Sequence, residues 1–238
     1  MMKLDVSIII PTFNEEEYLP KLLRSIQNQT MQPKEVIVVD AFSADRTVAI
    51  AKEFGCKVIS DKAIYTRARN IGAQAATQPV LIFLDADVVL PKAFLEKTIS
   101  EMMDRDLDIA SCYIKPLSGQ KIDILLHGFV NYYWKLTSKI IPHVPGFCIF
   151  ALKDIHKKIH GFDESLILCE DHDYVRRASK IGKFAYFKSY KIPVSVRRFS
   201  EEGRLTLSLK YLVFEIQFLL SKKVRKKVLP YEFGQHYK

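Results

Sequence analysis

Short apolar runs alternate with amphipathic segments along the first half of the chain. The runs are continuous in Val, Ile and Leu, as in strands covered on both faces. The segments between them place apolar residues three or four positions apart, as in helices. The predicted strands are residues 6–10, 35–40, 57–60 and 80–84. The predicted helices are residues 19–29, 47–54 and 67–76. This alternation predicts βαβ units, and therefore an α/β fold with a mostly parallel open sheet flanked by helices.

The second half of the chain is less regular. Its predicted strands are 108–114, 184–187 and 192–198, and its predicted helices are 122–141 and 170–178. In the helix 122–141 every fourth residue is polar, which gives one polar stripe beside a broad aromatic face. The stripe consists of Asp123, His127, Asn131, Lys135 and Lys139. A mainly apolar segment, 205–220, then precedes a basic cluster, KKVRKK, at 222–227.

The composition is that of an ordinary globular protein. The 238 residues are 48% hydrophobic and 26% charged, which excludes a disordered or fibrous chain and suits one domain with an appendage. The net charge of +9 favours anionic partners, but no nucleic-acid-binding motif accompanies it. The four cysteines show no C-x-x-C spacing, so we expect reduced thiols and a cytoplasmic location. We expect no signal peptide and no membrane-spanning helix.

Polar residues follow three of the predicted strands. They lie at 11–15, at 40–45, and at Asp85 and Asp87. Open α/β sheets bind ligands beyond the carboxyl ends of their strands, so these residues are expected to share one site. Two carboxylates one residue apart offer the oxygen ligands that Mg²⁺ or Mn²⁺ prefers.

A second acidic group begins the predicted helix 170–178. Asp171 could take a proton from an attacking hydroxyl if it lies in a cleft. Glu170 and Asp171 also suit a helix N-terminus, where acidic side chains complement the helix dipole. The two interpretations are compatible, and this segment alone favours the structural one.

Six motifs in order resemble the family 2 glycosyltransferases over about residues 6–198. They read SIIIPTFNEEEYL, VDAFSADRTVAIA, ARNIG, FLDAD, GFDESL and EDHDYVRR. The resemblance implies a GT-A fold and inverting transfer of a sugar from a nucleotide-diphosphate-sugar. It divides the chain into a glycosyltransferase domain, 1–203, and an amphipathic, basic C-terminal helical tail, 204–238. Within the domain, 1–113 is the Rossmann-like nucleotide-sugar half and 114–203 the acceptor half.

The resemblance also implies how the donor nucleotide is held. The loop after the first strand would contact base and ribose through Pro11, Thr12, Asn14 and Glu15. Asn14 also suits a helix N-cap, and Pro11 suits the end of a strand. Asp40 matches the residue that bonds the base, and its carboxylate can accept a hydrogen bond from an N–H of uracil or guanine.

The remaining implied roles belong to the reacting groups. Arg69 matches a cationic residue near the nucleotide. Asp87 would bind Mn²⁺ or Mg²⁺ directly, while Asp85 would touch the sugar or ribose beside the metal. Asp171 matches the catalytic base, and Glu170 is expected to contact the acceptor.

Two departures from the family refine these expectations. The Q-x-x-R-W signature of processive sugar polymerases is absent, and VRRFS stands at 196–200 instead, so we expect addition of a single sugar. No His lies between His172 and His236, which argues against a His metal ligand from this side. Arg197 and Arg198 are expected to clamp the diphosphate, because a guanidinium matches phosphate bidentately. A UDP-sugar is favoured over a GDP-sugar because uridine dominates in the family.

The tail and the long helix suggest where the acceptor is found. The aromatic face of 122–141 and the basic end of 205–227 suit an anionic membrane surface. We therefore expect a peripheral enzyme on the cytoplasmic face of the membrane. Its acceptor would be a polyprenyl phosphate or another lipid-linked molecule. Both helices could instead pack on the domain or on a partner subunit. The polar residues of 205–220 fall on two faces, Thr206/Lys210/Gln217 and Ser208/Glu215, which weakens the membrane interpretation.

Two other functions compete with sugar transfer. A sugar-phosphate nucleotidyltransferase would open with a Gly-rich basic phosphate loop, whereas PTFNEEE contains no Gly and three acids. A non-catalytic nucleotide-sugar binding subunit would not need Asp85, Asp87 and Asp171 together. The hypothesis of transfer requires that Asp40, Asp85, Asp87 and Asp171 converge around one cavity.

Overall fold

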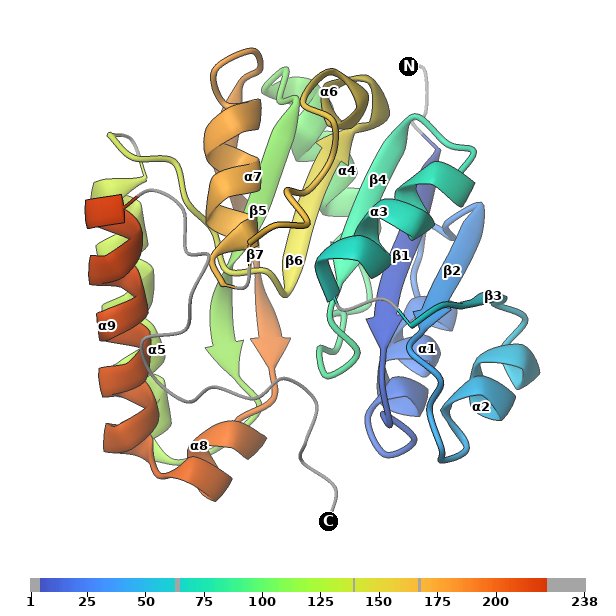
Figure 1. Ribbon diagram of the computed structural model, residues 1–238, viewed down its shortest axis with the longest axis horizontal. Helices are drawn as coiled ribbons and strands as arrows, with labels where there is room; N and C mark the ends of the chain where they lie inside the picture. The colour runs from blue at the N-terminus through green and yellow to red at the C-terminus, as the bar shows by residue number, and fades with distance from the viewer. Residues whose placement is uncertain (1–4, 63–64, 139, 167, 222–238) are drawn as a thin grey trace.

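The computed structural model describes residues 5–62, 65–138, 140–166 and 168–221 (Figure 1). Its strands are β1 (Val6–Thr12), β2 (Glu35–Asp40), β3 (Lys57–Ser60), β4 (Val80–Leu84), β5 (Ile109–Pro116), β6 (Cys148–Leu152) and β7 (Phe184–Val194). Its helices are α1 (Leu19–Gln27), α2 (Thr47–Glu53), α3 (Tyr65–Ala75), α4 (Phe94–Asp104), α5 (Lys121–Thr137), α6 (Lys153–Lys158), α7 (Glu170–Ala178), α8 (Arg197–Glu202) and α9 (Arg204–Ser221). Within these residues the strands form one sheet in the order β3-β2-β1-β4-β6-β5-β7.

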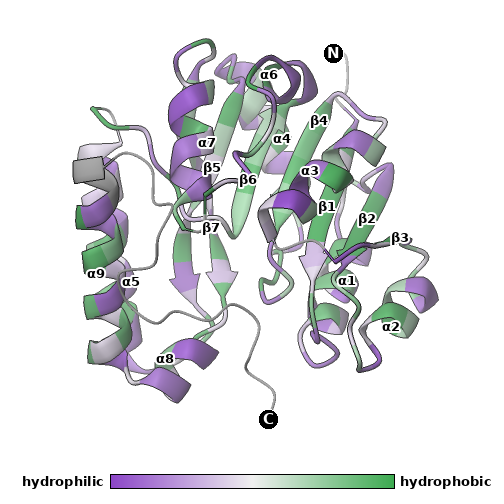
Figure 2. Cartoon of the chain, viewed as in Figure 1, coloured by the Kyte–Doolittle hydropathy of each residue, from purple (hydrophilic) through white to green (hydrophobic). Residues whose placement is uncertain are grey.

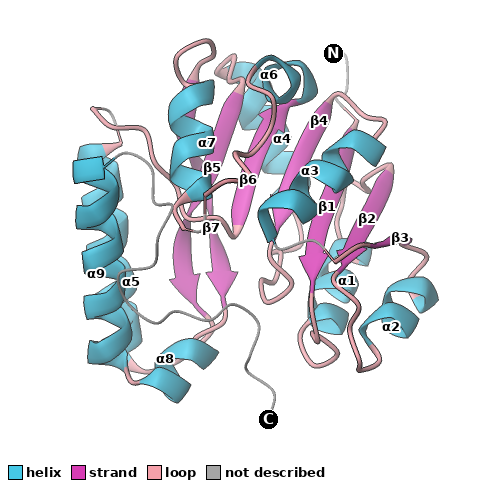
Figure 3. Cartoon of the chain, viewed as in Figure 1, coloured by secondary structure: helices cyan, strands magenta, loops and turns pink. Residues whose placement is uncertain are grey.

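The sheet is mostly parallel, as the alternating pattern predicts. β1 pairs in parallel with β2 and β4, β2 with β3, and β5 with β7. The exception is β6, which is antiparallel to both β4 and β5. Helices cover both faces, with α3 and α7 in front of the sheet and α4 behind it in the view of Figures 1 and 3. The carboxyl ends of β1, β2 and β4 therefore meet at one edge, where the first site loops begin.

The core explains why the parallel strands were readable from sequence. β4 is buried along its whole length, and α1 buries its apolar residues at helical spacing against the sheet. α3 approaches β1 so closely that a Cβ on Gly72 would stand 2.3 Å from a methyl carbon of Ile9. β1 extends through Pro11 to Thr12, beyond the predicted end. Its pairing with β4 stops at Ile9, so Pro11 lies where β1 has β2 as its one neighbour, a position that tolerates proline.

The structure corrects the prediction for the end of the domain. The two strands predicted at 184–187 and 192–198 are one strand, β7, whose register against β5 shifts between Ser111 and Tyr113. Arg197 and Arg198 are not in a strand: they begin α8. The long helix ends at Thr137 rather than at 141. The strand β6 and the helices α4, α6 and α8 are additional to the sequence prediction.

Helix α5 turns the first three residues of its polar stripe toward the protein. Asp123, His127 and Asn131 are buried, whereas Lys135 is exposed and Lys139 lies outside the described residues. Asn131 donates to the carbonyl of Ile114 at 2.8 Å and accepts from its N–H at 2.9 Å. β5 has no β6 partner that far along, so the Asn131 amide completes the open backbone of the strand. The polar residues of α5 therefore anchor the helix, which leaves its apolar face outward.

Helix α9 lies beside α5 (Figures 1 and 2). Arg204 at its start forms an ion pair with Asp123 at 2.7 Å, and Glu215 near its end accepts from Tyr133 at 2.9 Å, so the two helices run parallel. Both also expose a stripe of large apolar residues. The stripes are Leu125, Phe129, Tyr132 and Leu136 on α5, and Leu205, Leu209, Leu212 and Ile216 on α9. The predicted basic cluster at 222–227 lies outside the described residues.

Helix α9 packs on the domain with one side and exposes apolar residues on the other. Its inner side buries Leu207 and Phe214 around Leu168. In the part of the chain that the structure describes, no helix combines the length and the hydropathy needed to cross a membrane.

Candidate active site

The loops that follow β1 and β2 are bonded to each other. Asn14 adopts a left-handed backbone with φ of 53°, its N–H donates to Ser43 Oγ at 2.8 Å, and its side-chain oxygen accepts from the N–H of Ala44 at 2.9 Å. The N–H of Glu15 donates to Thr47 Oγ1 at 2.8 Å. Asn14 is therefore not a helix N-cap, because α1 begins at Leu19 after the cap residue Tyr18. Its side chain instead ties the two loops into one rigid wall of the site.

Asp40, at the end of β2, is fully buried behind these loops. It accepts hydrogen bonds from Thr12 Oγ1 at 3.0 Å, Ser43 Oγ at 2.5 Å and the N–H of Ser43 at 2.8 Å. An ionised carboxylate has about four acceptor positions, so three are used inside the protein. Thr12 and Asp40 thus lie in direct contact, and the Asp40 carboxylate supports the loop that follows β2.

Asp85 and Asp87 leave the carboxyl end of β4. The N–H of Asp85 donates to the carbonyl of Phe147 at 3.1 Å, which fixes the loop against the segment before β6. Burial and the negative charge of Asp85 raise the pKa of Asp87, while Arg197 and Arg198 act in the opposite direction. Two carboxylates forced together in this way form a site that a cation would stabilise.

Arg69 connects the DxD motif with the acidic start of α7. Its guanidinium is buried and donates to Asp85 Oδ1 at 3.0 Å, to Glu170 Oε1 at 2.9 Å and to the carbonyl of Gly146 at 3.1 Å. The residues it joins are separated by as many as 101 positions in the sequence. Asp85, Glu170 and Arg69 therefore form one cluster at the center of the sheet edge.

Asp171 lies next to this cluster, across Gly146. A Cβ built on Gly146 would stand 2.9 Å from an Arg69 guanidinium nitrogen and 3.2 Å from Asp171 Oδ2, so a larger residue there would have to displace Arg69. Burial alone would raise the pKa of Asp171, but the charge and hydrogen bonds of His172 and the charge of Arg69 hold it below its ordinary value. Asp171 is thus an ionised carboxylate at neutral pH, as a proton acceptor must be.

Arg197, at the start of α8, closes the other side of the site. It makes two bonds to Glu15, at 2.7 and 3.0 Å, its Nε lies 3.5 Å from Asp87 Oδ2, and its guanidinium covers the Tyr18 ring at 4.4 Å. Burial raises the pKa of Glu15 against the lowering effect of Arg197. Arg197 therefore lies beside Asp87 while it is bonded to Glu15, and the charge of Arg198 acts on the same carboxylate.

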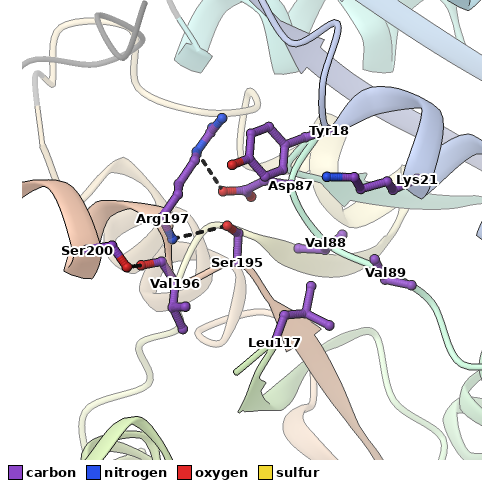
Figure 4. Close-up of a pocket in the computed structure, with 10 residues that line it drawn as sticks. All are labelled: Tyr18, Lys21, Asp87, Val88, Val89, Leu117, Ser195, Val196, Arg197 and Ser200. Carbon is purple, nitrogen blue, oxygen red and sulfur yellow. Dashed lines mark hydrogen bonds and ion pairs between the residues drawn. The ribbon is translucent and has the colours of Figure 1, made fainter. Parts of the chain in front are cut away.

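A cavity of about 310 Å³ opens beside Asp87 (Figure 4). Its wall includes Tyr18, Lys21, Ser195 and Arg197, so α1 and the β7–α8 turn enclose it. Of the four carboxylates expected around one cavity, Asp87 lines this one. Asp85 and Asp171 converge through Arg69, while Asp40 lies behind the loop wall.

Several residues of the site were missed by the sequence reasoning. Tyr65 begins α3, directly after the segment that follows β3 at the same sheet edge. Burial raises its pKa to about 12, and the charges that act on it come from Arg198, Glu15 and Asp85. Applying the rule of polar residues after a strand to β3 would have found Tyr65. Tyr18 and Lys21 carry no such signal, because both fall in the pattern of α1.

A divalent cation fits the donor atoms at the end of β4. Asp85 and Asp87 offer oxygen ligands alone, the type that Mg²⁺ and Mn²⁺ prefer. Among the residues that the structure describes, no group of three or more His, Cys, Asp or Glu side chains is arranged to hold a metal. Mg²⁺ commonly takes one or two protein carboxylates and completes its shell with water and substrate phosphates, so a carboxylate pair is sufficient.

Comparison with known proteins identifies the family. The sequence model of glycosyl transferase family 2 matches residues 7–160. Glycosyltransferase AglE of Haloferax volcanii is 28% identical over 190 residues, 74% of this chain and 62% of that protein. A dolichol-phosphate mannosyltransferase of Pyrococcus furiosus is 31% identical over 165 residues, 66% of this chain and 45% of that protein. The chain thus spans less than two thirds of the length of these relatives.

Solved structures share the fold. S. aureus TarS in complex with UDP superposes with a TM-score of 0.67 at 23% identity, covering 81% of this chain and 61% of that one. The mannosyltransferase PcManGT of Pyrobaculum calidifontis, in complex with GDP-Man and Mn²⁺, gives 0.73 at 19% identity, covering 97% and 67%. The GT-A fold expected from the motifs is confirmed. Together with the family match over more than half of the sequence, this shows that the chain belongs to glycosyl transferase family 2.

Proposed function

We propose that this protein transfers one sugar from a nucleotide-diphosphate-sugar to a hydroxyl or phosphate oxygen of an acceptor, with inversion at the anomeric carbon. The observation that carries the proposal is the cluster around the buried Arg69, whose guanidinium joins the DxD residue Asp85 to the α7 residue Glu170. Asp171 lies against the same guanidinium across Gly146. The proposed proton acceptor and the DxD residue Asp85 therefore lie against the same guanidinium, which supports a shared site.

The residues divide the work of a single displacement. Asp171 accepts the proton of the acceptor hydroxyl, whose oxygen forms a bond to the anomeric carbon. The bond from that carbon to the diphosphate oxygen breaks, and its electron pair leaves with the nucleoside diphosphate. A divalent cation held by Asp85 and Asp87 would neutralise the negative charge on that leaving group. Base catalysis supplies about 10²–10⁴-fold, so positioning and electrostatic stabilisation must supply the rest.

Arg69, Arg197 and Arg198 suit the binding of the anionic donor. Arg69 stands between the acidic motifs, and Arg198 acts electrostatically on Asp87. The loop wall with Asn14 and Asp40 offers the polar groups for base and ribose. We expect a UDP-sugar in preference to a GDP-sugar. Solved relatives include a complex with UDP and a complex with GDP-Man and Mn²⁺, which supports a nucleotide-sugar donor of either base.

The acceptor, in this proposal, is lipid-linked and reached at a membrane surface. The apolar stripes of α5 and α9 carry side chains that are 46% to 78% exposed, on two adjacent parallel helices. The basic cluster at 222–227 follows α9 in the sequence and matches anionic lipid in charge, at about 1 kcal/mol per Lys or Arg near the surface. A dolichol-phosphate mannosyltransferase among the relatives acts on an acceptor of this kind by its name. The proposed location is the cytoplasmic face of the membrane.

A donor panel tests the proposal. The protein is incubated with Mn²⁺ or Mg²⁺, UDP- and GDP-sugars and polyprenyl phosphate in vesicles, and nucleoside diphosphate release is measured together with the glycosylated lipid. Asp171→Asn should lower kcat at least about 100-fold, in keeping with the size of base catalysis, and leave donor KM nearly unchanged. Asp154→Asn, an exposed acid in the first turn of α6, is the matched control and should transfer normally.

The two competing functions give different products in this assay. A sugar-phosphate nucleotidyltransferase would release pyrophosphate from a nucleoside triphosphate and a sugar phosphate. A non-catalytic subunit would bind nucleotide without releasing any product. Either result, or full activity in Asp171→Asn, would contradict the proposal.

A further inference from the structure

His172, which follows Asp171, is enclosed by carboxylates from two different helices. Its Nδ1 lies 3.0 Å from Asp171 Oδ1 on α7, and its Nε2 lies 3.0 Å from Glu215 Oε2 on α9. The backbone N–H of His172 also donates to Asp171 Oδ1 at 2.8 Å. A helix from the far end of the chain thus reaches the proposed base through one imidazole ring.

Glu215 is itself held in place from α5, and His143 of the following loop lies beside it. Tyr133 donates its hydroxyl to Glu215 Oε1 at 2.9 Å. His143 is fully buried, has its Nδ1 2.6 Å from the carbonyl of Ile141 and its Nε2 3.6 Å from Glu215 Oε1. Because Nδ1 must carry a proton to bond a carbonyl, His143 faces Glu215 with its other nitrogen. Glu215 is therefore oriented on one oxygen by α5 and on the other by His172.

The charges around His172 favour its protonated form. Burial lowers its pKa, but the charge and hydrogen bonds of Asp171 and Glu215 outweigh burial and raise the pKa to about 10. Burial and the positive charge of His172 lower the pKa of His143, which is thus the neutral member of the pair. Burial raises the pKa of Glu215, but hydrogen bonding and charge from His172 bring it below its ordinary value. Nε2 then donates to Glu215, and the positively charged ring forms an ion pair with Asp171 through Nδ1.

The contacts of His172 use one oxygen of Asp171 and leave the other toward the site. Ring and backbone nitrogens of His172 both approach Oδ1. Oδ2 lies on the side of Gly146 and Arg69, 3.2 Å from where a Cβ on Gly146 would stand. Fixing Oδ1 therefore fixes the direction of Oδ2, the atom placed to receive the proton.

We propose that Glu215 of α9 is a positioning residue that acts through His172 to aim Oδ2 of Asp171 at the acceptor hydroxyl. The inference rests on the proposed function, because it takes Asp171 as the base. It makes α9 a working part of the transfer domain, although the sequence pattern assigns this helix to an appended tail. It also separates the two sides of α9, since Glu215 faces inward while Leu212 and Ile216 are exposed.

Glu215→Gln is the direct test, because it keeps the shape of the side chain and removes its charge. We expect kcat to fall about tenfold, equivalent to about 1.4 kcal/mol in the barrier, with donor KM changed less than about twofold. Glu202→Gln, which removes a comparable ion pair with Lys210 at 2.7 Å, should keep the wild-type kcat. In a His172→Asn background the Glu215→Gln change should cost less than about twofold more, because partners in one network are not additive.

The ionisation of His172 gives a readout that does not depend on turnover. Imidazole ¹⁵N NMR of the wild-type protein should show both nitrogens of His172 protonated at pH 8, and Glu215→Gln should move its titration to lower pH. The groups that face this ring are Asp171, Glu215 and neutral His143, with Arg69 on the far side of Asp171. The alkaline limb of kcat in Glu215→Gln should shift in the same direction.

The outcomes separate the two proposals. If the wild-type protein releases no nucleoside diphosphate with any donor but has a doubly protonated His172, the proposed function is overturned. The contact of His172 with Asp171 and Glu215, called the bridge below, is then retained. An active wild-type protein with neutral His172 at pH 8 overturns the bridge. So does a Glu215→Gln variant whose kcat equals that of the wild type while its melting temperature is unchanged. A Glu215→Gln variant that melts early but keeps kcat at low temperature assigns Glu215 a purely structural role and also overturns it.

Discussion

Replacing Gly146 by Ala inserts one carbon between the two halves of the proposed catalytic cluster. The new Cβ would lie 2.9 Å from one guanidinium nitrogen of Arg69, 3.4 Å from the other and 3.2 Å from Asp171 Oδ2. Gly146 is not among the glycines with positive φ, so the backbone itself admits alanine. The substitution therefore probes the position of Arg69 and Asp171 and little else.

The size of the effect follows from these distances. Relaxing the 2.9 Å contact to an ordinary 3.4 Å requires Arg69 to move by about half an ångström. Its bonds to Asp85 at 3.0 Å and to the Gly146 carbonyl at 3.1 Å would then approach the limit of a hydrogen bond. A charge-assisted hydrogen bond contributes about 1.5–3 kcal/mol, so losing one in the transition state should lower kcat about 10- to 100-fold.

Nucleoside diphosphate release, fitted for kcat and donor KM, is the assay, with urea unfolding alongside it. Gly182→Ala is the steric control, because its Cβ would stand 2.9 Å from the Asp108 side chain, far from the site in the structure. We expect Gly182→Ala to lose stability and keep kcat, and Gly146→Ala to lose kcat with the smaller loss of stability. Wild-type kcat in Gly146→Ala, or an equal kcat loss in the control, would refute the reasoning.

Three further results are expected. Because the pKa of His172 is raised to about 10 in the folded protein, the stability that its protonation provides is complete below about pH 6.5 and is lost as the pH rises toward about 10. The unfolding free energy of the wild type should therefore fall over this pH range. His172→Asn should remove this part of the pH dependence. Gly128→Ala, at an exposed position of α5 with open space around the new Cβ, should stabilise the fold by about 0.5–1 kcal/mol in urea titrations. The double variant Phe129→Glu/Leu209→Glu should bind anionic vesicles about tenfold more weakly in sedimentation, since each apolar side chain contributes about 1.5–3 kcal/mol on burial. Its donor hydrolysis in solution should be unchanged.

The parallel part of the fold was predictable because its signals are local. The strands at 35–40, 57–60 and 80–84 begin and end in the structure where the sequence pattern places them. The strands at 35–40 and 80–84 carry continuous apolar runs, and burial on both faces of a sheet requires that composition. The strand at 57–60 is a short edge strand, whose Lys57 and Ser60 are exposed. The DxD and Glu170–Asp171 segments were readable for the same reason, since each follows or begins a regular element.

The second half depends on contacts that no local pattern records. The direction of β6 is set by its position between β4 and β5, not by its own residues. The polar stripe of α5 predicts an amphipathic helix but not which side faces the protein. Buried partners decide this, since Asp123 binds Arg204 and Asn131 binds the backbone of Ile114. Arg69 as a link between the acidic motifs likewise depends on residues as many as 101 positions apart.

The reversed orientation of α5 has a consequence for how such a protein can change over time. One buried amide, that of Asn131, fastens the helix to the sheet, and the buried Asp123 fastens it to Arg204 of α9. The outer row of large residues makes none of these bonds. The residues of that row can therefore be replaced by charged residues or by residues of another shape with little effect on the packing of the core. Relocating the protein to a new surface would need substitutions on one exposed strip, while the edge of the sheet that carries the proposed site stays as it is.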